Sequence, residues 1–174
     1  VEKGILLKSG ETLEADVIIT ATGFDLNVMG DIAFHVDGKP VDFAQTVTYR
    51  GMMFTDVPNL VWVMGYFRAS WTLRADLTSR YVCRVLGHMD RHGYATAVPN
   101  HSEDGASRPL LDLQSGYVQR SVDLLPRQGA RPPWRIRQNY LLDFFTAKYS
   151  DVTEAMEFGR RAGTPTEEPV AVGA

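Results

Sequence analysis

Two short apolar runs, each followed by glycine, constrain the fold of this chain most strongly. Residues 16–20 read DVIIT and lead into the ATG of residues 21–23, while residues 60–64 read LVWVM and lead into Gly65. Continuous runs of β-branched and apolar residues are typical of strands buried on both faces of a sheet. Small residues after such strands let a ligand approach, although tight packing between neighbouring segments explains them more often. The runs predict an α/β fold that contains a piece of mixed sheet.

A helical pattern begins at Ser70. Apolar residues recur at every fourth position from Leu73 to Met89, and arginines fall mostly on the opposite side. Ser70 is a suitable N-cap, while His92 and Gly93 supply the cationic last turn and the glycine that commonly end a helix. The sequence predicts its clearest helix between these limits.

The other segments carry weaker patterns. Turn residues at 9–11 predict a hairpin, and those at 37–39 predict a turn inside an otherwise irregular stretch. Residues 99–109 read as a polar surface loop. Apolar spacing and flanking prolines predict three further helices, over residues 118–125, 136–145 and 152–158.

Composition and charge indicate a globular chain. The 174 residues are 44% hydrophobic and 22% charged, which is enough to form a core without disulfides or a structural metal. The single cysteine, Cys83, suits a reducing compartment, and the net charge of -3 argues against nucleic acid as a partner. No run reaches the roughly 18 apolar residues of a membrane span. We therefore expect a cytoplasmic protein. The sequence gives no indication of its oligomeric state.

Motifs for several common chemistries do not occur in the sequence. GxGxxG, GxxxxGK[ST], HExxH and GxSxG are absent, so the chain has no complete dinucleotide turn, zinc motif or nucleophilic serine elbow. His88 and His92 stand one helical turn apart and could hold a metal, but interaction with the helix C-terminus is the favoured role. No metal site is predicted.

Several motifs resemble, in order and spacing, a flavoenzyme family. The DVIITATGF of residues 16–24 looks like the ATG motif of flavin-containing and Baeyer–Villiger monooxygenases, which closes their NADPH-binding domain. Further motifs resemble the C-terminal part of the ethionamide-activating subgroup, and the match covers most of residues 4–150. These motifs are YRGMM (49–53), VPNL (57–60), GY (65–66), ASWTL (69–73), DL (76–77), GYV (116–118), LP (125–126), QG (128–129), PWR (133–135) and QNY (138–140).

The resemblance implies FAD and NADPH as cofactors. Enzymes of this family use NADPH to reduce FAD, trap O2 as a C4a-peroxyflavin and insert one oxygen atom into a ketone or onto sulfur or nitrogen. The implied partners are a small ketone or thioether and O2. The family's FAD and NADPH glycine motifs and its FxGxxxHxxxWP fingerprint are absent. This absence, and the first residue Val1 in place of methionine, indicate the C-terminal portion of a longer enzyme, inactive by itself.

The implied parent is a flavoprotein with two dinucleotide-binding domains. Residues 1–23 would end the NADPH-binding domain with the ATG return strand. Residues 24–158 would form the C-terminal part of the FAD-binding domain with a helical extension. Residues 159–174 lack large apolar side chains and are expected to be a mobile tail.

The resemblance also implies site residues. The expected cofactor contacts are Ala21, Thr22, Gly23, Gly65, Tyr66 and Ser70, and the expected substrate contact is Trp71. The last four would lie where the second strand meets a helix whose N-terminus faces the flavin. Taken singly, Ser70 as a simple N-cap and Trp71 as a core aromatic are about equally well supported.

No catalytic residue is assigned. The arginine that supports the peroxyflavin in this family is expected upstream, so Arg50, Arg68 and Arg74 are not given that role. The competing interpretation is a truncated, inactive reading frame or an interaction module. An unpartnered piece of sheet would then expose its apolar edges.

Overall fold

The computed structural model describes residues 3–23, 26–67, 69–101, 107–111 and 114–160. Its helices are α1 (Trp71–His92), α2 (Gly116–Ser121) and α3 (Tyr140–Tyr149), with short 3-10 helices η1 (Met29–Asp31), η2 (Phe43–Gln45) and η3 (Val122–Leu124). The strands form antiparallel pairs: β1 (Gly4–Leu6) with β2 (Thr12–Glu14), β3 (His35–Val36) with β4 (Lys39–Pro40), β5 (Thr48–Tyr49) with β6 (Met53–Phe54), β7 (Tyr94–Pro99) with β10 (Met156–Arg160), and β8 (Arg108–Pro109) with β9 (Arg127–Gln128).

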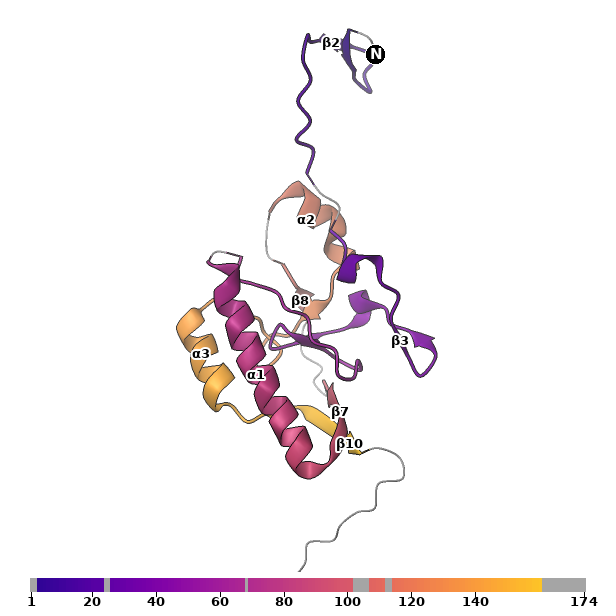
Figure 1. The fold of residues 1–174 in the computed structure, drawn as a ribbon. Coiled ribbons are helices and arrows are strands. Elements are labelled where there is room, and N and C mark those ends of the chain that lie inside the picture. Colours follow the sequence, from indigo (N-terminus) through magenta and orange to yellow (C-terminus); the bar gives the residue numbers. More distant parts are fainter. Residues whose placement is uncertain (1–2, 24–25, 68, 102–106, 112–113, 161–174) are drawn as a thin grey trace, which may run out of the picture.

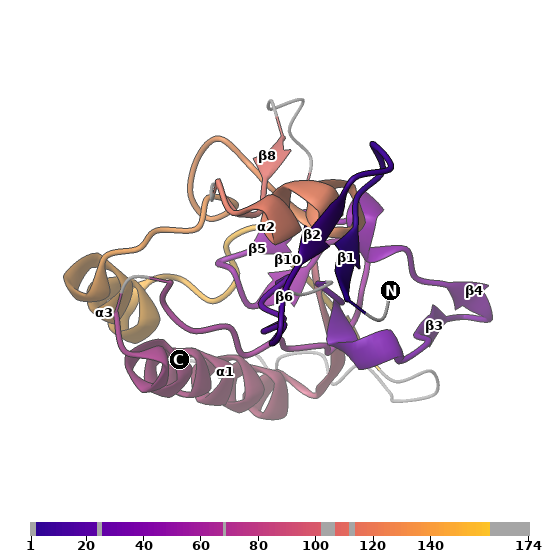
Figure 2. The same ribbon diagram turned by 90° about the horizontal axis from the view of Figure 1, so that it is seen from above.

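The helix α1 is the longest element and the centre of the fold. Figure 1 shows α3 alongside it, β7 and β10 at its C-terminal end, and the β1–β2 hairpin standing away from the remaining chain. Seen from above, the β3–β4 hairpin lies at the edge opposite α3 (Figure 2). Both helices and strands are present, as an α/β fold requires. Within the described residues, however, the strands form two-stranded pairs, and the expected mixed sheet is not found.

The predicted limits of α1 are confirmed. Ser70 occupies the N-cap position, and Gly93 ends the helix in the left-handed conformation with φ 67°, a region that favours glycine. The apolar stripe is buried from Leu77 to Met89, whereas Leu73 is 41% exposed. The periodicity therefore predicted the buried face correctly from Leu77 to Met89, whereas Leu86, expected beside this stripe, is 51% exposed.

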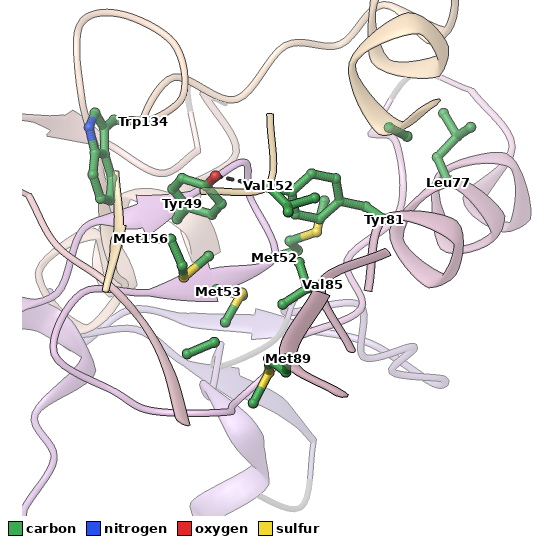
Figure 3. Close-up of a cluster of buried hydrophobic side chains, with 12 residues drawn as sticks. Tyr49, Met52, Met53, Leu77, Tyr81, Val85, Met89, Trp134, Val152 and Met156 are labelled. Atoms are coloured by element: carbon green, nitrogen blue, oxygen red, sulfur yellow. Dashed lines mark hydrogen bonds between the residues drawn. The ribbon is translucent and has the colours of Figure 1, made fainter. Parts of the chain in front are cut away.

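The main core joins α1 to the β5–β6 pair and to the chain around β10. Figure 3 shows Tyr49 and Tyr81 meeting in it, with their hydroxyl oxygens 2.9 Å apart. The Tyr49 hydroxyl also donates to the carbonyl oxygen of Glu154 at 2.9 Å. Burial and the neighbouring Tyr81 raise the pKa of Tyr49, so this phenol stays protonated. The remaining core members are Met52, Met53, Leu77, Val85, Met89, Ala97, Trp134, Ala147, Val152 and Met156.

The two strands predicted from the apolar runs are wrong. Residues 16–20 follow the β1–β2 hairpin as an extended segment outside any strand, and Ile19 is 88% exposed. Residues 60–65 are also outside the strands, although Met64 is buried. A strand exists only where a neighbour satisfies a row of its backbone N–H and C=O groups. No described segment forms such a ladder with either run, and the second run has a single bond of this kind, from the Trp62 N–H to the Met52 carbonyl at 2.7 Å.

Helix predictions near the end of the chain had mixed outcomes. The helix predicted over 118–125 corresponds to α2 followed by η3, and that over 136–145 corresponds to α3, which starts later. The helix predicted over 152–158 is wrong, because this segment turns and enters β10, which pairs with β7. β7 was itself missed.

The predicted tail (residues 159–174) and the predicted surface loop (residues 99–109) can be compared with the structure only in part, because each contains residues outside the described ones. The first tail residues, Gly159 and Arg160, belong to β10, and residues 161–174 lie outside the described residues. The surface loop predicted over residues 99–109 is wrong at its ends, because Pro99 ends β7 while Arg108 and Pro109 form β8. Its residues 102–106 lie outside the described residues. None of the described helices is both long and apolar enough to cross a membrane.

Candidate functional site

The start of α1 brings four of the predicted site residues together. Ser70 and Trp71 begin the helix, and Gly65 and Tyr66 lie on the segment that leads into it. The indole ring of Trp71 rests against Gly65: a Cβ added there would come within 2.5 Å of Cε3 of Trp71. Glycine is therefore required at residue 65 for this ring position.

Trp71 lies at the surface. Its relative exposure in this structure is 54%. Ser70 is exposed, and its hydroxyl contacts that of Thr72 at 2.9 Å. The Ser70 side chain accepts no hydrogen bond from a backbone N–H of the first turn of α1. The first-turn N–H groups of a 22-residue helix are thus open to another partner.

Tyr66 anchors this region to α3. It is only 4% exposed, and its hydroxyl donates to Oδ2 of Asp143 at 2.7 Å. Arg74, one turn into α1, donates to the same carboxylate oxygen at 3.0 Å and places its guanidinium 5.3 Å from the centre of the Tyr66 ring. Arg74 also donates to the carbonyl oxygens of Arg137 and Arg50.

Burial and hydrogen bonding shift the pKa values of Tyr66 and Asp143. Burial raises the pKa of Tyr66, and the hydrogen bond to Asp143 raises it further, so the phenol remains a donor. Burial also raises the pKa of Asp143, while Tyr66 and Arg74 oppose that shift by stabilising the charged carboxylate. The cluster fixes the segment at 65–66 relative to α1 and α3.

The remaining predicted site residues lie elsewhere. Ala21, Thr22 and Gly23 are exposed, and Gly23 lies against α2, where an added Cβ would come 3.5 Å from Cβ of Tyr117. Gly23 has a φ of +92°, a conformation that favours glycine. The structure therefore does not bring the ATG segment to the start of α1. Phe24, the last residue of that motif, lies outside the described residues.

Sequence reasoning missed the partners of the arginines. Arg74 pairs with Asp143, and Arg50 pairs with Glu154 at 2.5 Å. Arg68 lies outside the described residues. The pattern placed the arginines of α1 mostly on the side opposite the apolar residues, and this is wrong for Arg74, which is buried. The sequence spacing of 69 residues gave no indication of its carboxylate partner. Among the described residues no group of three metal-ligating side chains gathers.

Comparison with known proteins finds relatives that are named as FAD-containing or FAD-binding monooxygenases. It is 45% identical over 154 residues to the FAD-containing monooxygenase EthA of Mycolicibacterium smegmatis, a match covering 88% of this chain and 31% of that protein. It is 45% identical over 160 residues to EthA of Mycobacterium tuberculosis H37Rv, covering 91% and 33%. The "Probable FAD-binding monooxygenase AlmA" of an Acinetobacter species is 41% identical over 165 residues, covering 91% and 32%.

These relatives confirm the resemblance predicted from the motifs. The chain is homologous to part of the FAD-containing monooxygenases and spans about a third of the length of the curated relatives it matches. No family model and no solved structure matches it.

Proposed function

We propose that this chain is the C-terminal part of an FAD- and NADPH-dependent monooxygenase of the Baeyer–Villiger type. Its substrate would be a small ketone, into which one oxygen atom of O2 is inserted, or a thioether, onto whose sulfur that atom is transferred, while the other oxygen atom is reduced to water at the expense of NADPH. The observation that carries the proposal is the 45% identity to FAD-containing monooxygenases over nine-tenths of the chain. The clustering of Gly65, Tyr66, Ser70 and Trp71 at the start of α1 supports it.

The residues at this end of α1 are suited to face a flavin. The first turn has no side-chain cap, so its N–H groups and the positive end of the helix dipole can stabilise negative charge on an isoalloxazine ring. Gly65, Tyr66 and Ser70 would hold that ring edge. When bound, FAD reduced by NADPH supplies the oxygen-activating chemistry. The buried Tyr66–Asp143–Arg74 cluster keeps the backbone at 65–66 in place.

Trp71 would form one wall of the substrate cavity. Its ring is large, apolar and 54% exposed, so it can contact an apolar ketone or thioether and exclude water from it. Its position is set by Gly65 on one side. In this proposal Trp71 is a substrate contact and takes no part in proton transfer.

The domain assignment is also part of the proposal. Residues 1–23 would complete the NADPH-binding domain, and residues 24–158 would complete the FAD-binding domain. The exposure of Val17 and Ile19, at 76% and 88%, supports this, because β-branched residues at these levels would be covered by neighbouring strands of a larger sheet. A cytoplasmic location is proposed because the sequence has a single cysteine and no apolar run long enough for a membrane span.

The test replaces Trp71 with alanine in the full-length enzyme that contains this chain. Turnover and selectivity for ketones and thioethers should change several-fold, while NADPH-driven flavin reduction persists. The melting temperature should stay nearly constant, because the ring is half-exposed. Leu73→Ala, at a 41% exposed residue in the same turn, is the matched control and should leave selectivity unchanged. Unchanged selectivity in Trp71→Ala would contradict the proposed role.

A second experiment addresses the isolated chain. It has no glycine-rich turn for the FAD pyrophosphate, so it should emerge from gel filtration with added FAD as a colourless protein. Stoichiometric flavin absorbance in the protein peak would contradict the assignment of the pyrophosphate site to another part of the enzyme.

The alternative function is a non-catalytic interaction module. The observation in its favour is the exposed apolar face of α3, where Leu141, Phe145 and Tyr149 are 66%, 58% and 64% exposed. Two observations together would favour this alternative: the purified 174-residue chain is stable, soluble and monomeric, and no longer reading frame encodes it.

A further inference from the structure

A small basic cavity lies between α1, α3 and residues 132–137. Its volume is about 50 Å3. Four arginines contribute to its lining: Arg50, Arg74, Arg135 and Arg137. We propose that this cavity binds a phosphate group. The proposal is independent of flavin binding at the start of α1.

The charges around the cavity are unbalanced. One carboxylate, that of Asp143, joins the four arginines in the lining. Asp143 is engaged by Arg74, and Arg50 is paired with Glu154. Within the described part of the chain, Arg135 and Arg137 have no ion-pair partner. The two guanidinium groups at the mouth are therefore available to a bound anion.

The Nε–H group of Arg74 has no hydrogen-bond acceptor among the described residues. The Arg74 side chain is only 6% exposed, and its Nη1 and Nη2 groups donate to Asp143 and to two carbonyl oxygens. Its Nε is fully buried and has no hydrogen-bond partner among the described residues. A buried guanidinium N–H without an acceptor is costly, and an oxyanion in the adjoining cavity would satisfy it.

Size and charge favour phosphate. A cavity needs roughly 10–15 Å3 of such volume to hold one water, so this one has room for a small oxyanion. Arginine forks bind carboxylate and phosphate through paired hydrogen bonds. Arg50 and Arg74 are paired with Glu154 and Asp143, so Arg135 and Arg137 leave two positive charges that a dianion neutralises better than a monoanion. Arg135 and Arg137 are exposed, so a free ion or a phosphate group on a larger molecule can enter from solvent.

The test is isothermal titration calorimetry on the 174-residue chain and, in parallel, on the full-length enzyme that contains it. The probes are inorganic phosphate and glycerol 3-phosphate, with acetate at equal ionic strength as the monoanion comparison. We expect a dissociation constant of about 1 mM or lower for at least one phosphate probe. Arg135→Gln and Arg137→Gln should each weaken binding about tenfold, as expected for a lost charged hydrogen bond.

The control is Arg108→Gln, which removes an exposed arginine of β8 outside the cavity and should leave binding unchanged. Binding of inorganic phosphate would support a site for the free ion, and binding of glycerol 3-phosphate alone would support a site for a phosphorylated molecule. Absence of heat up to about 10 mM of either probe in folded protein would overturn the proposal. Equal weakening in Arg108→Gln, or acetate binding as tightly as phosphate, would also overturn it.

Discussion

Replacing Gly65 with alanine should displace the indole ring of Trp71. The added Cβ would come within 2.5 Å of Cε3 and closer still to Cγ and Cδ2, distances at which atoms must move apart. The backbone at Gly65 is outside the left-handed region, so alanine is acceptable there apart from this contact. The ring is 54% exposed and can rotate toward solvent. Only its packing against residue 65 would be lost.

The expected cost follows from this geometry. Inserting a methyl group into a packed site costs about 1–3 kcal/mol, and the exposure of Trp71 puts this case near the lower limit, at about 1 kcal/mol. In a Trp71→Ala background the obstructing ring is absent. Gly65→Ala should then be neutral or stabilise the folded state by up to about 1 kcal/mol, because alanine restricts the unfolded chain. The two substitutions should therefore show a coupling energy of about 1–2 kcal/mol.

Urea unfolding followed by far-ultraviolet circular dichroism measures this coupling in the wild type, both single variants and the double variant. Gly87→Ala is the control, because an added Cβ there meets no atom within 4 Å. It lies inside α1, where alanine is favoured over glycine, so it should stabilise the protein by about 0.5–1 kcal/mol. If Gly65→Ala costs the same with and without the indole ring, contact with Trp71 is not the cause.

Three further predictions concern the core, the aspartates and the exposed run. Tyr49→Phe removes a buried hydroxyl with three hydrogen-bond contacts and should lower the free energy of unfolding in urea by about 1–3 kcal/mol, whereas Tyr149→Phe, at a 64% exposed residue, should leave it unchanged. Burial raises the pKa of Asp143, so the stability linked to its protonation is present at low pH and lost as pH rises. Hydrogen bonds from a nearby threonine lower the pKa of Asp151, so the stability linked to its charged form is present above the ordinary aspartate pKa of about 4 and lost as pH falls. As the pH falls from neutral to acid, the free energy of unfolding of the wild type should therefore rise relative to that of Asp143→Asn and fall relative to that of Asp151→Asn. Differences that stay constant with pH would contradict both assignments. Ile19→Ser, at an 88% exposed residue, should leave the melting temperature of the isolated chain unchanged and reduce its light scattering; a fall in melting temperature would show that Ile19 is buried in solution.

The helix α1 shows what local patterns can predict. Its apolar spacing and the glycine at its end are signals within one segment, and the structure places both limits where the pattern puts them. The β1–β2 hairpin was predictable for the same reason, since its strands are joined by a short glycine-containing turn. The relationship to FAD-containing monooxygenases was likewise readable from the order and spacing of short motifs.

Pairings between distant residues could not be read in this way. Residues 152–158 carry a helix-like pattern, yet β10 forms there because β7, more than 50 residues earlier, supplies its backbone partner. Residues 16–20 have a strand composition, yet no described neighbour pairs with them. Strand formation depends on a partner that the segment's own sequence does not specify.

For the candidate site, the sequence alone determined that a helix would begin near Ser70 and that Gly65, Tyr66 and Trp71 would lie beside its start. Only the tertiary structure decided that the indole ring lies against Gly65 at the surface and that Arg74 is buried in an ion pair with Asp143. The physical reason is that helix limits depend on contacts within a few residues, whereas the burial and pairing of a side chain depend on which distant segment packs against it.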